Sequence, residues 1–337
     1  MVEIERIPNV VVIGGGTGSS VVLKGLKNYE CSLSAIVPMG DSGGSSARLR
    51  EDFGVLSAGE IRQRIIALAT EEDGVNEIAN LLDYRFERGK ELRGHNFGNI
   101  MITALSELYG SQKKAIEILS NLVNAKGKII PSTWDKFELV AEYENGKKII
   151  SEHFIDESSE DSRITRLYAQ PMPKANQQAI EAIRNADVII FGPGDLYTSI
   201  LHNLVVDGIP QAINESKAKK IFISNLMTSR GETTGMGVQD LVVELERYIG
   251  TNIDTLVLNS QELPSEIVRA YEKDGQFPVS FNLGDEIKNR VKILKADILS
   301  EKVHTKPSSD ILQRSMLKHD SEKLGAAIMS IIQGGLK

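Results

Sequence analysis

The chain has 337 residues, of which 41% are hydrophobic, and a formal net charge of −7 at pH 7. That length and apolar content suffice for one large α/β core, and the acidic balance excludes nonspecific binding to nucleic acid. No apolar stretch is long enough to insert into and span a membrane, and a single cysteine, Cys31, excludes an internal disulfide, so we expect a cytoplasmic protein.

The first predicted strand, residues 9–13, ends at a run of glycines. Gly14, Gly15, Gly16, Thr17 and Gly18 follow it, and a helical pattern begins at Ser19. A strand that ends at glycines and enters a helix presents backbone N–H groups and the positive end of the helix to a phosphate. The run lacks the Gly-Lys-Ser/Thr of a P-loop, and Ser19 replaces the third glycine of the dinucleotide pattern. We predict a phosphate site here, with a tight strand–helix turn as the structural alternative.

The second predicted strand, residues 32–37, leads into a polar loop. Because neighbouring strands of a doubly wound sheet end at the same edge, this loop should face the first one. Asp41 could hold a ribose hydroxyl or a Mg²⁺ ion, and forked arginine donors suit phosphate oxygens. The candidate ligand contacts in this loop are Asp41, Ser42, Gly43, Gly44, Ser45, Arg48 and Arg50.

The remaining pattern alternates between helices and strands. Helices are expected over 59–69, 75–86, 96–108 and 112–123, followed by a small antiparallel β excursion over about 126–172 with a hairpin at Asn145-Gly146. Strands at 188–191, 220–224 and 255–258 alternate with helices near 198–206, 210–216 and 237–248, and a last helix covers 321–333. The sequence predicts one domain, residues 1–337, with a Rossmann-like three-layer α/β/α fold and a mostly parallel, doubly wound sheet.

A third loop follows the apolar run 188–191. Gly192 and Gly194 break this strand, and Asp195, Tyr197 and Thr198 open the next helix, where they could either contact a ligand or cap the helix. His95 lies in another glycine loop and, with Asp41, is a candidate catalytic group. The asparagines that could contact a base or a sugar are Asn96, Asn99 and Asn225. No His/Cys cluster has the spacing of metal ligands.

Four of these motifs together resemble one family. The glycine run at 14–18, the stretch 41–50, the loop 94–99 and the segment 192–199 are similar in order and spacing to the YvcK-like gluconeogenesis factors. That family is a branch of the CofD-like superfamily of 2-phospho-L-lactate transferases, and the resemblance covers about residues 8–334. Ser42 replaces the family's second acid, and Ala47 replaces a glycine. Residues 57–63 replace Pro-Pro-Gly-Asp-x-Arg-Asn but keep a carboxylate and an arginine, and we count Glu60 and Arg62 among the candidate ligand contacts.

The resemblance implies a binding protein for a UDP-sugar or a related nucleotide, which regulates carbon metabolism and cell-envelope morphogenesis without catalysis. It also implies ligand contacts at Tyr271 and Lys318. Two alternatives remain open at this point. One is a phospholactyl-type transferase that uses a nucleoside diphosphate-activated donor and Mg²⁺, and the other is an NAD(P)-type dinucleotide binder. No cofactor other than Mg²⁺ is expected, and we expect a homo-oligomer.

Overall fold

The computed structural model describes residues 6–40, 43–71, 76–302 and 315–335. Its main sheet has seven strands in the order β10-β9-β8-β7-β1-β2-β3, and every pairing in it is parallel. The strands are β1 (Asn9–Ile13), β2 (Ser32–Val37), β3 (Lys128–Pro131), β7 (Val188–Phe191), β8 (Lys219–Ile223), β9 (Thr255–Asn259) and β10 (Lys292–Ala296). The predicted α/β fold is confirmed.

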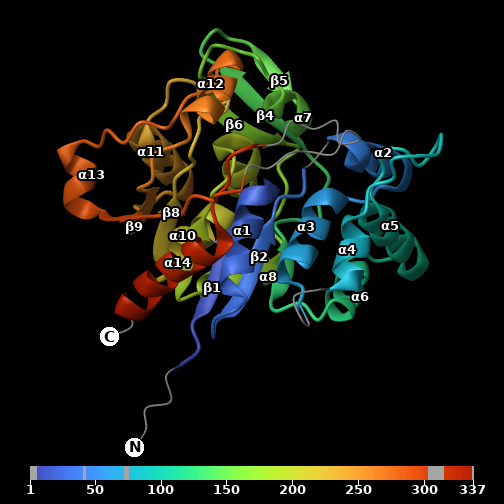
Figure 1. Ribbon diagram of the computed structural model, residues 1–337. Coiled ribbons are helices and arrows are strands. Elements are labelled where there is room, and N and C mark those ends of the chain that lie inside the picture. The colour runs from blue at the N-terminus through green and yellow to red at the C-terminus, as the bar shows by residue number, and fades with distance from the viewer. Residues whose placement is uncertain (1–5, 41–42, 72–75, 303–314, 336–337) are drawn as a thin grey trace, which may run out of the picture.

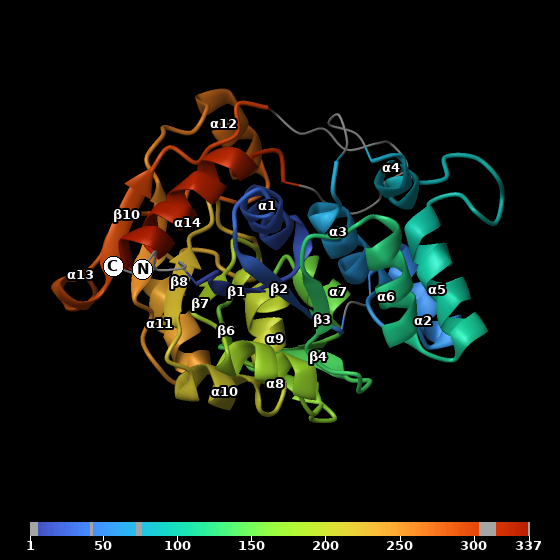
Figure 2. The same ribbon diagram turned by 90° about the horizontal axis from the view of Figure 1, so that it is seen from below.

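Helices cover both faces of this sheet (Figure 2). One face carries α1 (Gly16–Leu26), α3 (Ala58–Leu68) and α14 (Ser321–Gly335), and the other carries α8 (Gln177–Arg184), α10 (Ile209–Glu215) and α11 (Val238–Ile249). The central strands are buried on both faces, which explains why the sequence of β7 is a continuous apolar run. A further group gathers beyond β3: α2 (Gly44–Phe53), α4 (Glu77–Asp83), α5 (Phe97–Tyr109) and α6 (Gln112–Leu122).

The antiparallel excursion forms a second, three-stranded sheet. Its order is β5-β4-β6, with β4 (Glu138–Tyr143), β5 (Lys148–Ile150) and β6 (Ile164–Gln170), and α7 (Glu152–Asp156) follows β5. Figure 1 shows this sheet at the end of the molecule toward which the main strands run. The predicted excursion is confirmed, but residues 128–131 belong to the main sheet, because β3 pairs in parallel with β2.

Some elements differ from the sequence pattern. Helix α1 begins at Gly16 rather than Ser19, and residues 44–53 form α2, whose polar sequence has no apolar period to indicate a helix. The pattern also missed α13 (Asp285–Arg290) and β10. The predicted helix near 198–206 is split into the π-helical turn η1 (Leu196–Leu201) and α9 (His202–Leu204). Among the described residues, no helix is both long and apolar enough to cross a bilayer.

Candidate functional site

A cavity of about 710 Å³ opens at the carboxyl edge of the main sheet. It lies where β1, β7 and β8 end, which is the position at which doubly wound folds bind their ligands. Eight residues predicted as site residues line it, and they come from five separate parts of the chain: Gly16, Thr17, Gly18, Gly194, Asp195, Asn225, Tyr271 and Lys318. The fold therefore brings together a large part of the predicted site.

A buried ion pair holds the first glycine loop. The carboxylate of Glu60 accepts the Gly16 N–H at 3.0 and 3.2 Å, and the Arg64 guanidinium donates to Glu60 at 2.9 Å. Arg64 also donates to the carbonyls of Gly14 at 3.2 Å and Gly16 at 2.8 Å. Glu60 thus occupies a backbone donor that we assigned to a ligand phosphate, and its role here is to position the loop.

Two glycines of this loop are required by the backbone itself. Gly16 has φ = +62°, a conformation that a residue with a Cβ adopts only with strain. A Cβ on Gly18 would lie 2.1 Å from the carbonyl oxygen of Pro193, so glycine lets α1 approach the third loop. Gly14 and Gly15 do not line the cavity but pack behind it, against Ser19 and Ser199.

The carboxylate of Glu232 also accepts hydrogen bonds at the start of the helical segment that follows the third loop. Glu232, which is 2% exposed, accepts the N–H of Tyr197 at 3.0 Å and the hydroxyl of Thr198 at 2.6 Å. Burial, together with the nearby Asp195 and Asp156 carboxylates, raises the pKa of Glu232. The side chains of Tyr197 and Thr198 are therefore engaged in the fold. The Tyr197 hydroxyl donates to Glu244 at 3.0 Å, and burial raises its pKa.

Polar groups of the third loop remain in the cavity wall. Asn225 pins Gly194 from both sides, since its carbonyl oxygen accepts the Gly194 N–H at 3.0 Å and its amide donates to the Gly194 carbonyl at 2.8 Å. Gly192 precedes this clamp and does not line the cavity. The hydroxyl of Ser229 donates to the Asp195 carboxylate in a short hydrogen bond. Asp195 and Ser229 thus lie side by side, and both line the cavity.

Tyr271 and the segment 315–319 also line the cavity. Tyr271 lies on α12 (Ser265–Lys273), is 6% exposed, and accepts the N–H groups of Met316 at 2.7 Å and Leu317 at 3.1 Å through its hydroxyl oxygen. The residue thus anchors a stretch of the wall. Lys318 lines the cavity, and its backbone carbonyl accepts the Ser300 N–H at 3.0 Å.

The predicted residues that lie outside this cavity include Arg48, Arg50, Arg62, His95, Asn96 and Asn99. The Arg50 guanidinium donates to the Phe137 carbonyl and the Glu138 carboxylate, at 2.6 and 2.8 Å, and so ties α2 to the start of β4. Burial and the charges of Arg48 and Arg85 lower the pKa of His95.

The other three of these residues hold α3, α4 and α5 together. Arg62 donates to Asn99 at 3.1 Å and pairs with Asp83, and Asn96 caps α5 by accepting the Gly98 N–H at 2.9 Å. None of these residues lines the cavity, and the three contacts pack the helices against one another.

The second loop is described only in part. Asp41 and Ser42 lie outside the described residues, so the predicted ligand contacts and the possible Mg²⁺ site at Asp41 stay predictions. Gly43 is the N-cap of α2, and Gly44 and Ser45 begin that helix. Within the described ranges, no group of three or more His, Cys, Asp or Glu side chains is arranged to hold a metal ion.

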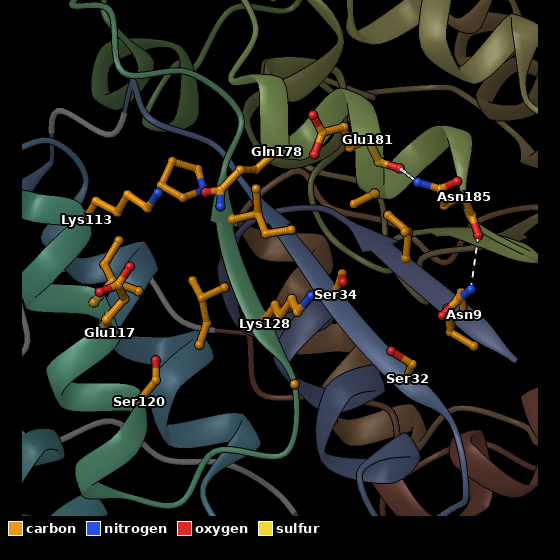
Figure 3. A pocket seen from close by; sticks show the side chains of 18 of the residues that line it. Asn9, Ser32, Ser34, Lys113, Glu117, Ser120, Lys128, Gln178, Glu181 and Asn185 are labelled. Atoms are coloured by element: carbon orange, nitrogen blue, oxygen red, sulfur yellow. Dashed lines mark hydrogen bonds between the residues drawn. The ribbon is translucent and has the colours of Figure 1, made fainter. Parts of the chain in front are cut away.

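A second cavity, of about 570 Å³, lies between α6 and α8 (Figure 3). Its floor includes Ser32 and Ser34 of β2 and Lys128 of β3, and its walls carry Lys113 and Glu181. None of the predicted site residues lines it. It opens beside the edge strand β3 rather than at the carboxyl ends of the strands, so we do not assign the nucleotide to it.

Three residues that shape the site were not among the predicted ones: Arg64, Glu232 and His202. His202 is fully buried, and its Nε2 accepts the Gly40 N–H at 3.1 Å while its Nδ1 lies 3.0 Å from the Thr198 carbonyl. It links the second loop to the third. Arg64 follows Glu60 by one helical turn, which is a readable ion-pair spacing, but nothing local indicated that Glu232 or His202 contacts these loops.

Comparisons with known proteins identify the family of this chain. Residues 10–299 match the family described as 2-phospho-L-lactate transferase CofD. A Thermotoga maritima protein whose name contains the words gluconeogenesis factor is 42% identical over 323 residues, which are 96% of this chain and 98% of that protein. The gluconeogenesis factor of Bacillus subtilis is 34% identical over 97% of this chain and 98% of its own length.

A solved structure shows the same fold. It is a member of the UPF0052 family from Bacillus halodurans, with a TM-score of 0.86 and 33% identity, and the match covers 96% of this chain and 99% of that one. The sequence identity, the coverage and the shared fold lead to one conclusion. The chain belongs to the CofD family, among its gluconeogenesis factors.

Proposed function

We propose that this protein binds a UDP-sugar in the carboxyl-edge cavity and acts as a regulator of carbon metabolism and cell-envelope morphogenesis. The observation that carries the proposal is the convergence of the glycine loop, Asp195, Asn225, Tyr271 and Lys318 on one cavity of about 710 Å³. That volume lies within the usual range for small-molecule sites. The names of the relatives support the link to carbon metabolism.

The chemistry of the wall suits such a ligand. The amides of Thr17 and Gly18 lie at the first turn of α1, beyond the Gly16 amide that Glu60 occupies, and the helix end favours negative charge. Lys318 adds a cation to the lining, and Asp195 and Ser229 offer partners for sugar hydroxyls. A diphosphate next to a sugar would find a complementary group at each of these positions.

Calorimetric titration with UDP-N-acetylglucosamine tests the proposal. We expect micromolar affinity, and we expect the ligand to be recovered intact by ³¹P NMR after long incubation with Mg²⁺. A protein that is folded but shows no heat of binding with any UDP-sugar would contradict it. Mass spectrometry of ligands retained during purification gives an independent reading.

A transferase is the second candidate, because the matching family is named for the transfer of 2-phospho-L-lactate. Its marker is Mg²⁺-dependent release of a nucleotide from a nucleoside diphosphate-activated donor. That release, if lost in Asp41→Asn, would favour the transferase over the regulator. Asp195→Asn changes a carboxylate that lines the cavity. Measuring both the affinity and the nucleotide release of this variant distinguishes weaker binding from lost turnover.

We further propose that the protein acts in the cytoplasm as a homo-oligomer. The lone Cys31 supports the first point, since a chain with one cysteine forms no internal disulfide and suits a reducing compartment. Light scattering coupled to size-exclusion chromatography tests the second. A single peak at the monomer mass of 37.0 kDa would contradict it.

A further inference from the structure

Part of the cavity lining is an apolar shelf. We give this name to Leu226, Met227, Met316 and Leu317, all of which line the cavity. They pack with Tyr271 in a small cluster that is separate from the main core. Methionine side chains are polarisable and adapt to flat partners, so the shelf suits one face of a planar ring.

One polar atom beside this shelf has no partner. His319 lines the same cavity and is 8% exposed, and its Nε2 is buried without a hydrogen-bond partner among the described residues. Buried polar atoms in folded proteins are nearly always paired, so an unpaired nitrogen on a residue that lines a cavity points to a group that a ligand supplies. The backbone of Ser224 already bonds this ring.

The ring is held in place and kept neutral. Leu299 forms an antiparallel bridge with His319, and the neighbouring Asp320 N–H donates to Ile298 at 2.8 Å. Burial lowers the pKa of His319 to about 4, so the imidazole is uncharged at pH 7. A neutral imidazole carries one N–H and one acceptor nitrogen. The hydrogen bond with the Ser224 backbone raises the pKa, as a bond donated by the ring does, so we assign the N–H to that nitrogen and the acceptor role to the unpaired Nε2.

We propose that the shelf binds the nucleobase and that His319 Nε2 accepts the ring N–H of that base. This inference rests on the proposed nucleotide site and adds its base specificity. Uracil carries a hydrogen on N3, whereas the corresponding nitrogens of cytosine and adenine carry none and would oppose their lone pairs to Nε2. A site built to pair with a ligand N–H rejects analogues that lack it, because its own polar group is then left buried and unpaired.

The test compares ligands before it compares variants. We expect wild-type protein to bind UDP at least 10-fold more tightly than CDP and than UDP methylated at N3. His319→Leu should bind UDP more weakly and remove the preference for UDP over CDP. A matched control is His153→Leu, because this histidine of α7 does not line the cavity and its variant should keep the full preference.

The outcomes distinguish failure of the role of His319 from failure of the proposed nucleotide site. Equal affinities of wild-type protein for UDP, CDP and N3-methylated UDP would overturn the role of His319 while leaving a nucleotide site in place. No binding of any of the three, nor of a UDP-sugar, would overturn the proposed function as well. Because His319→Leu alters a buried residue, ¹⁵N NMR of the wild-type ring provides a check that needs no variant. The Nε2 resonance should shift when UDP is added and should stay in place with N3-methylated UDP, and an unmoved resonance with UDP refutes the contact.

Discussion

The ion pair between Glu60 and Arg64 gives the sharpest stability prediction. The Arg64 side chain is 1% exposed and donates to Glu60, Gly14, Gly16 and Ser20. Arg64→Met keeps the length of the side chain but leaves two loop carbonyls and one carboxylate without this donor. Removing one partner of a buried ion pair costs about 3–5 kcal/mol. At roughly 2 °C per kcal/mol for a chain of this size, we expect the melting temperature to fall by about 6–10 °C.

Urea and thermal unfolding of four proteins would measure this coupling. They are the wild type, Arg64→Met, Glu60→Leu and the double variant. Because both single changes break the same pair, the double variant should lose less than the sum of the two, with a coupling of about 0.5–3 kcal/mol. Lys114→Met serves as the control, since it breaks an exposed pair with Glu117 and should change stability by less than about 1 kcal/mol. Additive losses, or a change in Arg64→Met as small as in the control, would refute the energetic coupling between Glu60 and Arg64.

Two further predictions concern anchoring and pH. Tyr271→Phe keeps the ring but removes the hydroxyl oxygen that accepts the Met316 and Leu317 N–H groups. We expect UDP-sugar affinity to fall about 10-fold and hydrogen exchange at these two amides to rise. Unchanged affinity and exchange would show that only the ring matters. Burial lowers the pKa of His202 from about 6.5 in the unfolded chain to about 4 in the folded protein. Between pH 4 and pH 6.5 the unfolded chain therefore binds more protons than the folded protein. The stability that neutral His202 contributes is then present above about pH 6.5 and lost as pH falls toward 4, by about 2 kcal/mol at pH 5. Unfolding of His202→Gln against pH should show a shallower acid loss than wild type, and parallel curves would count against the buried neutral ring.

Local patterns were sufficient to identify the layers of the fold. The apolar run Val188–Phe191 is a strand buried on both faces, and Asn145-Gly146 turns the hairpin between β4 and β5, with Gly146 at φ = +82°. The glycines at 14–18 do end a strand and begin a helix at the carboxyl edge. These features depend on periodicity and on backbone preferences of single residues, both of which are written within a few neighbouring positions.

Tertiary structure decided which polar groups remain available to a ligand. Glu60 contacts Gly16 from 44 residues away, and Glu232 contacts Thr198 from 34 residues away. The protein's own carboxylates therefore occupy two helix N-termini that the sequence pattern predicted as phosphate sites. Tyr271, which we expected to face a ligand, uses its hydroxyl on a segment 45 residues further along the chain. The sequence by itself determined where strands break and helices begin, because those choices are made by short-range sterics. The pairing of donors and acceptors across the carboxyl edge depends on which loops the parallel sheet brings together, and no local spacing encodes it.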